Sequence, residues 1–212
     1  MSGENARCAR AAAITSSSCR PACTSAPYIV YIGLGANVGD RRASLKRALR
    51  LAAQIEDTRL LRVSSFYETP PWGNEAQPPF LNACAALETR LRPLVLLRFL
   101  QRIERALGRV RKMHWGPRTI DIDMLLAEGY TSEAPELRLP HPYLHERAFV
   151  ILPLMEITSG LIVRDRPLAD WLAALPEAAA CRKVSTYISL KKGRIVLSHE
   201  RKTIFFCTNM VK

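Results

Sequence analysis

The stretch GRVRKMHWGPRTIDID, residues 108–123, places a cationic loop directly before a strand that carries two carboxylates. Between Thr119 and Leu126, isoleucine and methionine side chains alternate with Asp121 and Asp123. Because successive side chains of a strand point to opposite faces, both aspartates project from one side and the apolar residues face a core. The pattern predicts a strand of a sheet with one buried face.

The two carboxylates indicate a cation site. Carboxylates about 7 Å apart on one rigid face repel each other unless a cation lies between them. Hard divalent cations such as Mg²⁺ prefer oxygen ligands, and substrate phosphates usually complete the shell. Upstream, Arg109, Arg111, Lys112 and Arg118 could hold those phosphates. Metal, phosphate and guanidinium together suggest phosphoryl-type transfer.

Two ordinary interpretations compete with this one. An Asp-x-Asp pair is commonly the solvated face of an edge strand, and a cluster of arginines is commonly a solvated or polyanion-binding surface. The close spacing of both features, joined by the turn Trp115-Gly116-Pro117, favours nucleotide chemistry.

Composition fits one domain with a substantial core, at 212 residues and 48% hydrophobic content. The formal net charge of +12 is unevenly distributed, because the first 26 residues and residues 186–212 contribute more than half of it. In the centre, residues 98–118 hold seven basic side chains against Glu104 alone. Such local basicity suits a small polyanionic ligand better than a nucleic acid.

The ends and the cysteines suggest where the protein works. The six cysteines form no Cys-x-x-Cys pair and no zinc-ligand pattern, which fits a reducing, cytoplasmic setting. No apolar run approaches the roughly 20 residues that cross a bilayer. We expect residues 1–26 to be a flexible extension, residues 27–185 to be the domain, and residues 186–212 to be a basic tail with two short β-like runs.

The coarse pattern predicts an α+β fold. The expected order is a strand at 28–34, a helix after Asp40, strands at 60–67 and 80–88, a helix between Pro93 and Gly108, and a strand at 119–126. This order is typical of a ferredoxin-like α/β sandwich, with helices packed on one side of an antiparallel sheet. Residues 151–157 are expected in the core and residues 168–175 in a short helix.

The glycine-rich segment 33–39 superficially resembles a nucleotide-binding loop. It has Val38 where the dinucleotide motif needs its third glycine, and it lacks the Gly-Lys-Ser/Thr of a P-loop. We therefore interpret it as a tight turn from strand to helix.

Several segments together resemble one family, 6-hydroxymethyl-7,8-dihydropterin pyrophosphokinase of the folate pathway. They occur in the family's order over about residues 28–180, and they are Tyr31–Asp40, Ser64–Pro71, Gln77–Asn82, Gln101–Glu104, Gly108–Asp123, Pro140–Pro142 and Arg147–Phe149. The segments before Pro27 and after about Val184 are not part of the family pattern.

The resemblance implies transfer of the β,γ-pyrophosphoryl group of ATP to the pterin hydroxymethyl oxygen, with release of AMP. It implies that Asp121 and Asp123 bind two Mg²⁺ ions and that Arg109 and Arg118 complete the catalytic set. It also implies a monomer whose partners are small-molecule substrates, with no nucleic acid and no membrane.

The resemblance also implies two sets of binding residues. The ATP set is Gln101, Arg111, Trp115, Arg118, His141 and Arg147. The pterin set is Thr69, Pro70, Trp72, Phe80, Asn82, Glu104 and Phe149, in which the two phenylalanines sandwich the pterin ring. Taken singly, each phenylalanine is ordinarily a core residue, and Gln101 and Glu104 fit a solvated helix face almost equally well. Phe80 also lacks the hydroxyl of a tyrosine often found at its position.

Two other classes of function stay open at this point. A basic RNA-binding protein would need sheet-face aromatics in the RNP pattern, which the strands at 80–88 and 119–126 lack. A metal-dependent nucleotidyltransferase would share Asp-x-Asp but would release pyrophosphate instead of AMP. Two loops, residues 73–79 and 108–117, are rich in glycine, proline and polar residues, and we expect them to close over substrates.

Overall fold

The computed structural model describes residues 23–72, 76–109, 116–184, 187–191 and 194–198, the last two stretches as backbone only. In chain order, the elements of the main domain are β1 (Cys23–Ala36), α1 (Arg41–Ala52), β2 (Thr58–Val63), β3 (Tyr67–Thr69), β4 (Phe80–Leu91), α2 (Pro93–Ala106) and β5 (Asp121–Ala127). Next come β6 (Ser132–Ala134), β7 (Leu137–Leu139), α3 (Ala148–Ile157), β8 (Ile162–Val163), β9 (Arg166–Pro167), α4 (Leu168–Ala173) and β10 (Arg182–Lys183). The chain continues as β11 (Tyr187–Lys191) and β12 (Arg194–Ser198), and 3-10 turns lie at Leu144–Glu146 and Pro176–Ala180.

A six-stranded antiparallel sheet forms the centre of the molecule. Its strand order is β10-β3-β4-β1-β5, and β2 pairs with β4 as well. Strands β2 and β3 lie one after the other along the same edge of β4, with β3 beside residues 80–82 and β2 beside residues 85–89. The predicted α+β fold with an antiparallel sheet is confirmed, and this strand order is that of the ferredoxin-like arrangement.

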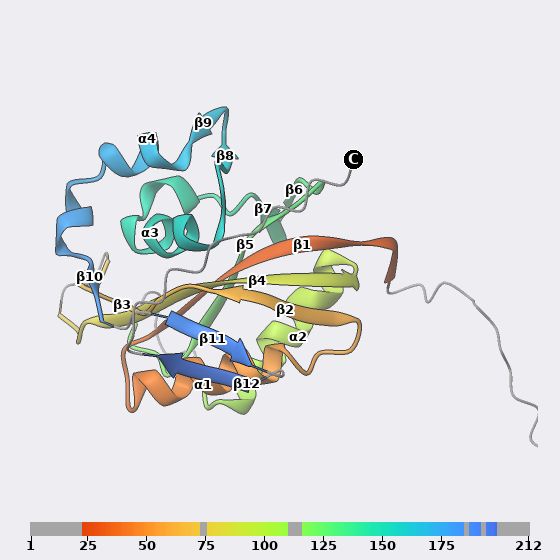
Figure 1. Cartoon of the computed structure of the whole chain (residues 1–212), viewed down its shortest axis with the longest axis horizontal. Helices are drawn as coiled ribbons and strands as arrows, with labels where there is room; N and C mark the ends of the chain where they lie inside the picture. Colours follow the sequence, from red (N-terminus) through yellow and green to blue (C-terminus); the bar gives the residue numbers. More distant parts are fainter. Residues whose placement is uncertain (1–22, 73–75, 110–115, 185–186, 192–193, 199–212) are drawn as a thin grey trace, which may run out of the picture.

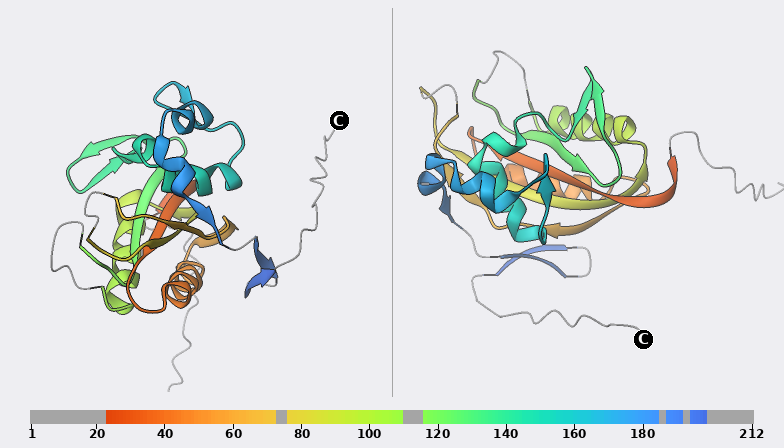
Figure 2. Two further views of the ribbon diagram at one scale, coloured as in Figure 1. Left: turned by 90° about the vertical axis from the view of Figure 1, so that its left-hand side faces the viewer. Right: turned by 90° about the horizontal axis from the view of Figure 1, so that it is seen from above.

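Helices cover both faces of this sheet (Figures 1 and 2). Helices α1 and α2 pack on one face over the main core, which includes Ile32, Leu87 and Ile122. On the opposite face, α3 and α4 pack over a second core with Tyr31, Cys84, Ala86 and Leu125. The expectation of helices on one side was therefore incomplete. The apolar run at 151–157 lies within α3, and its buried side chains cover the second face.

Local sequence signals explain where the helices begin and end. Asp40 caps α1, its side chain accepting a hydrogen bond from the backbone N–H of Ala43 at 2.9 Å. Pro93 begins α2, and Gly108 follows that helix with a φ of +82°. Gly39, with a φ of +67°, lies in the turn between β1 and α1.

Two strand predictions need correction. The expected strand at 60–67 is divided into β2 and β3. The Ser64 N–H still donates to the Cys84 carbonyl, but the Cys84 N–H donates to the Ser64 hydroxyl oxygen, and the Ser65 N–H turns to the Glu156 carboxylate, so the backbone ladder is interrupted. The first strand runs to Ala36, so Gly33 and Gly35 lie inside β1 and not in a turn. That strand also starts at Cys23, four residues before the expected domain boundary.

The C-terminal part adds one strand to the sheet and a separate hairpin. Strand β10 pairs with β3, and the Val184 N–H donates to the Phe66 carbonyl at 2.9 Å. The two β-like runs expected after residue 186 pair with each other as β11 and β12. None of the helices in the described ranges is long and apolar enough to span a membrane.

Candidate active site

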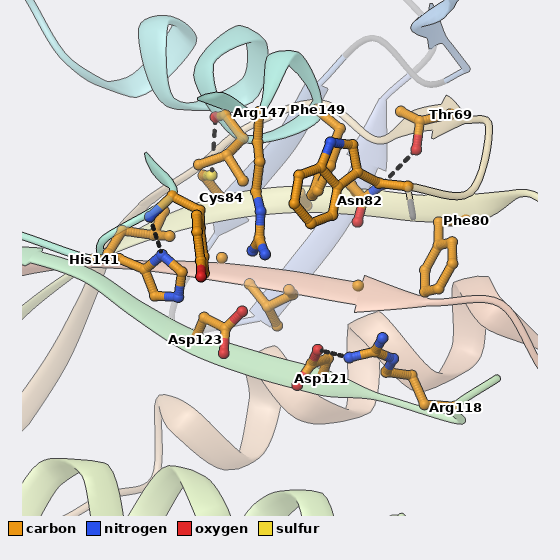
Figure 3. A pocket seen from close by; sticks show the side chains of 18 of the residues that line it. Thr69, Phe80, Asn82, Cys84, Arg118, Asp121, Asp123, His141, Arg147 and Phe149 are labelled. Carbon is orange, nitrogen blue, oxygen red and sulfur yellow. Dashed lines mark hydrogen bonds and ion pairs between the residues drawn. The ribbon is translucent and has the colours of Figure 1, made fainter. Parts of the chain in front are cut away.

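The candidate site is a cavity of about 630 Å³ on the sheet face that carries α3. Helix α3 covers only part of this face, and the cavity occupies the part near the end of β1 (Figure 3). Its described lining includes Gly33, Gly35, Thr69, Pro70, Trp72, Phe80, Asn82, Arg109, Arg118, Asp121, Asp123, His141, Tyr143, Arg147 and Phe149. Most residues that the sequence assigned to a site thus lie together.

Strand register explains why the floor of this cavity is open. Gly35 of β1 lies between Asn82 of β4 and Asp121 of β5, and Gly33 lies in the same way between Cys84 and Asp123. The two glycines therefore form a trough without side chains between an amide and two carboxylates. Sequence reasoning missed this role, because the glycine spacing alone suggested a turn.

The carboxylates lie on the strand face predicted for them. Ile122 and Met124 are buried in the main core, while Asp121 and Asp123 are partly exposed in the cavity. Burial and the neighbouring charge of Asp121 raise the pKa of Asp123, whereas Arg147, Arg109 and Arg118 lower it. The free protein thus holds a carboxylate whose charge is only partly compensated.

Arg109 and Arg118 approach the acidic pair from the segments on either side of residues 110–115. Both guanidinium groups form ion pairs with Asp121, and Arg109 also pairs with Glu104. Glu104 is buried on α2 and accepts a hydrogen bond from the N–H of Ile122 at 2.7 Å. Burial raises the pKa of Glu104, and Arg109 opposes that change. Glu104 therefore holds Arg109 against β5.

Aromatic rings and an amide line the opposite side of the cavity. The Asn82 amide donates to the Thr69 hydroxyl at 2.7 Å, which fixes its orientation. The ring of Phe80 stands beneath the Arg118 guanidinium, 5.6 Å from its central carbon. In Figure 3, Phe80, Asn82 and Phe149 lie on the side of the cavity away from Asp123. This side offers flat apolar surfaces and a single polar edge.

Arg147 lies between these two sides. Its guanidinium carbon is 4.7 Å from the ring centre of Trp72, 5.1 Å from that of Tyr143 and 5.7 Å from that of Phe149. Its Nε is buried without a hydrogen-bond partner in the described residues. Burial lowers the pKa of Arg147, although Asp123 and Asp121 raise it. A cation held this way is ready to bind an anion.

A second cavity of about 330 Å³ adjoins the first on the α2 side of β5. It shares Arg109, Asp123 and His141 with the first cavity, and Gln101, Glu104 and Arg138 also line it. Gln101 and His141, both members of the expected ATP set, line this second cavity together. Glu104, assigned to the pterin set, lies in this second cavity, apart from Phe80 and Asn82.

Some of the expected site residues lie outside the described residues. Arg111 and Trp115 fall in the segment 110–115, and residues 73–75 of the other loop are also outside the described residues. Tyr143, Gly33 and Gly35 were missed as lining residues. Tyr143 carries no motif of its own, and only its position two residues after His141 could have drawn attention to it.

The donor set at β5 fits Mg²⁺. Among the described residues, no group of three His, Cys, Asp or Glu side chains could hold a metal ion. Asp121 and Asp123 alone would leave most of the coordination shell to other oxygens. Mg²⁺ is commonly bound in this manner, by one or two carboxylates together with substrate phosphates and water.

Comparisons with known proteins indicate one family. Residues 31–159 match the family described as 7,8-dihydro-6-hydroxymethylpterin-pyrophosphokinase (HPPK). A 2-amino-4-hydroxy-6-hydroxymethyldihydropteridine pyrophosphokinase of Methylorubrum extorquens is 46% identical over 145 residues, covering 68% of this chain and 92% of its own length. The enzyme of the same name from Pseudomonas aeruginosa is 43% identical over 148 residues, covering 69% of this chain and 91% of its own.

Solved structures agree at the level of the fold. An HPPK-DHPS of Plasmodium falciparum, crystallised with pterin and p-hydroxybenzoate, gives a TM-score of 0.60 at 14% identity. The comparison covers 81% of this chain and 49% of that one, so this chain spans about half the length of that protein. With the family match over residues 31–159 and relatives above 40% identity, the chain belongs to the HPPK family.

Proposed function

We propose that this protein transfers the β,γ-pyrophosphoryl group of ATP to the hydroxymethyl oxygen of 6-hydroxymethyl-7,8-dihydropterin and releases AMP. The observation that carries the proposal is the juxtaposition, across the trough of Gly33 and Gly35, of an aromatic and amide wall with an acidic and arginine-rich wall. Family membership and the names of the relatives support the same reaction.

The pterin binds on the aromatic side in this proposal. Phe80 and Phe149 stack on the two faces of the ring, and Asn82 presents its amide to the pyrimidinone edge. Thr69 fixes the Asn82 amide, and Trp72 with Pro70 closes the outer end. Offset stacking adds about 1 kcal/mol per ring beyond the burial of apolar area.

ATP binds across β5. The second cavity, with Gln101 and His141, takes the nucleoside, and the triphosphate passes Asp123 towards the trough. Arg109, Arg118 and Arg147 bind its oxygens. In the free protein Arg109 and Arg118 are paired with Asp121, so the triphosphate would exchange one anionic partner of each arginine for another. Planar guanidinium groups suit this exchange because they bind phosphate oxygens in a bidentate manner.

The proposed chemistry is a displacement at the β-phosphorus of ATP. A bond forms from the hydroxymethyl oxygen to that phosphorus and the bond to the α–β bridging oxygen breaks. AMP departs with that oxygen, and the hydroxyl proton passes to solvent water. Asp121 and Asp123 would hold two Mg²⁺ ions, which supply neutralisation of triphosphate charge. The rest of the catalysis is positioning and electrostatic stabilisation by the arginines and the stacked rings. We further propose that the protein acts as a cytoplasmic monomer.

The decisive experiment is product analysis. The protein, ATP, Mg²⁺ and the hydroxymethyl pterin should together yield AMP and the pterin diphosphate, with no AMP when the pterin is omitted. Release of pyrophosphate in place of AMP would instead indicate a nucleotidyltransferase.

A pair of variants tests the division of the site into two sides. Arg118→Ala should reduce kcat far more than pterin affinity. Phe149→Ala should weaken pterin binding by about 1–3 kcal/mol through lost stacking and burial. Calorimetry with a non-hydrolysable ATP analogue present measures the pterin affinity of each variant. Equal pterin affinity in Phe149→Ala and the wild type would contradict the assignment of Phe149.

A further inference from the structure

Asn37 joins two parts of the site that are far apart in the sequence. It directly follows β1, and the residue is only 3% exposed. Its backbone N–H donates to the Arg118 carbonyl at 3.1 Å, and its Oδ1 accepts from the Arg118 N–H at 2.8 Å. Both the N–H and the carbonyl of Arg118 are therefore fixed by this one residue.

The other end of the Asn37 amide holds the chain that enters the aromatic wall. Its Nδ2 donates to the Gln77 Oε1 at 3.0 Å and to the Pro78 carbonyl at 3.3 Å. The next residues are Pro79 and Phe80, the latter at the start of β4. Reversing the amide would place its NH₂ group against the Arg118 N–H and its oxygen against the Pro78 carbonyl. The contacts therefore admit only one orientation.

We propose that Asn37 is a positioning residue that couples the phosphate-binding arginine to the pterin-binding wall. It lines neither cavity, so it acts through Arg118 and Phe80 and not by touching substrate. Arg118 in turn lies over the Phe80 ring, so the Asn37 contacts and this side-chain contact both join Arg118 to the same short segment, residues 77–80. When the triphosphate orders Arg118, Phe80 should become ordered too, and pterin bound at Phe80 should likewise order Arg118.

Arg41, the first residue of α1, provides a comparison. Its Nη1 donates to the Pro79 carbonyl at 2.7 Å, and its Nη2 pairs with Glu68 at 2.9 Å. It thus holds the segment before Phe80 as Asn37 does, but both of these contacts lie on the pterin side. Loss of Arg41 should affect the pterin side alone, whereas loss of Asn37 should affect both sides and the coupling between them.

The test compares four variants of the full chain and rests on the proposed function. Asn37→Ala removes the side-chain contacts to the Arg118 N–H, Gln77 and Pro78 but keeps the backbone bond to the Arg118 carbonyl. Asn37→Asp keeps an acceptor for the Arg118 N–H but faces the Pro78 carbonyl with an oxygen. Arg41→Ala loosens the pterin side, and Arg42→Ala, the next position of α1, is the matched control. Each protein is assayed for kcat and both KM values. Pterin is also titrated with and without Mg²⁺ and a non-hydrolysable ATP analogue.

The expected results separate the variants. In the wild type and in Arg42→Ala, the nucleotide should raise pterin affinity at least tenfold. In Asn37→Ala this coupling should fall to less than threefold, with kcat at least tenfold lower and the pterin KM raised. Asn37→Asp should raise the pterin KM similarly but keep kcat within about threefold of the wild type. Arg41→Ala should raise the pterin KM alone.

Other results would overturn the proposal. Unchanged coupling and KM values in Asn37→Ala, with only a lower melting temperature, would make Asn37 purely structural. If Asn37→Ala does not fold, unchanged constants in Asn37→Asp would lead to the same conclusion. If Arg41→Ala matched Asn37→Ala in every constant, the contact between Asn37 and Arg118 would not contribute to the coupling. A wild type that releases no AMP would refute the proposed function, while the binding titrations would still test the coupling.

Discussion

At the scale of single residues, Asp123 illustrates how a site opposes stability. Burial and the charge of Asp121 raise its pKa, so the folded protein disfavours the ionised carboxylate that a cation requires. Such a residue is maintained for what it binds and not for the fold.

We therefore predict that Asp123→Asn, which keeps the shape and removes the charge, lowers the rate of AMP release at least 100-fold. Because the folded state disfavours the charge, the melting temperature at pH 7 should be unchanged or higher. Turnover assays with Mg²⁺-ATP and thermal unfolding check both parts. A variant with near-normal turnover would contradict the metal-binding assignment of Asp123.

His141 carries a second prediction at this scale. Burial, and then Arg147, lower its pKa to about 4. Its Nδ1 accepts a hydrogen bond from the Tyr143 N–H at 3.2 Å, so a neutral ring carries its proton on Nε2 and can donate to a phosphate or ribose oxygen. The ring should thus act as a neutral donor at pH 7.

The pKa of His141 in the folded protein lies below the ordinary histidine value of about 6.5. The stability due to a neutral His141 is therefore fully present above pH 6.5 and is lost as the pH falls towards about 4. Titration of the ring by NMR should give a midpoint well below 6, and His141→Gln should lose less stability than the wild type over that range. A midpoint near 6.5 would show that the ring is not held neutral.

At the scale of elements, β1 shows what sequence alone could not provide. The alternation of residues 119–126 predicted which face carries the aspartates, because a strand has a period of two. The same reasoning could not interpret Gly33 and Gly35, since a missing side chain has no direction of its own. Their meaning depends on register, which places Gly35 beside both Asn82 and Asp121.

Alanine substitutions at Gly35 and Gly33 form a matched pair of variants. A Cβ at Gly35 would lie 2.8 Å from the Asn82 Oδ1, whereas a Cβ at Gly33 would lie 3.4 Å from the flexible Leu125 side chain. Gly35→Ala should displace the Asn82 amide and raise the pterin KM at least tenfold, while Gly33→Ala should change it much less. Equal pterin KM values in the two variants would show that Asn82 does not read the pterin.

The packing of helix α3 also could not be predicted from the sequence. Helices α1 and α2 show apolar stripes, so their packing on one sheet face follows from periodicity. The apolar run in α3 indicates burial but not the surface against which it packs. Only the structure places α3 on the second face, where the residues at its start, Arg147 and Phe149, reach the cavity.

At the scale of the whole molecule, the strand order was largely predictable, because it rests on local patterns in chain order, whereas the two sets of binding residues came from the family resemblance. The connections between distant segments were not predictable. Glu156, near the end of α3, accepts hydrogen bonds from the Ser65 N–H at 2.6 Å and the Tyr67 hydroxyl at 2.9 Å. It also forms an ion pair with Lys183 of β10. One carboxylate thus joins α3, β3 and the C-terminal edge strand.

This connection yields a prediction that separates stability from function. Glu156→Ala removes the acceptor of a buried N–H, which should lower the free energy of unfolding by about 1–3 kcal/mol. For a chain of this length, the melting temperature should fall by about 2–4 °C per kcal/mol. The pterin KM measured well below the melting temperature should stay within twofold. The opposite end of α3, with Phe149, is held by the buried side chains of Leu144, Ile151 and Leu154.

Glu133→Ala, on exposed β6, is the control and should change neither the free energy of unfolding nor the pterin KM. If the pterin KM of Glu156→Ala rose together with the loss of stability, the position of Phe149 would depend on the far end of α3, and the site could not be treated as independent of that anchor.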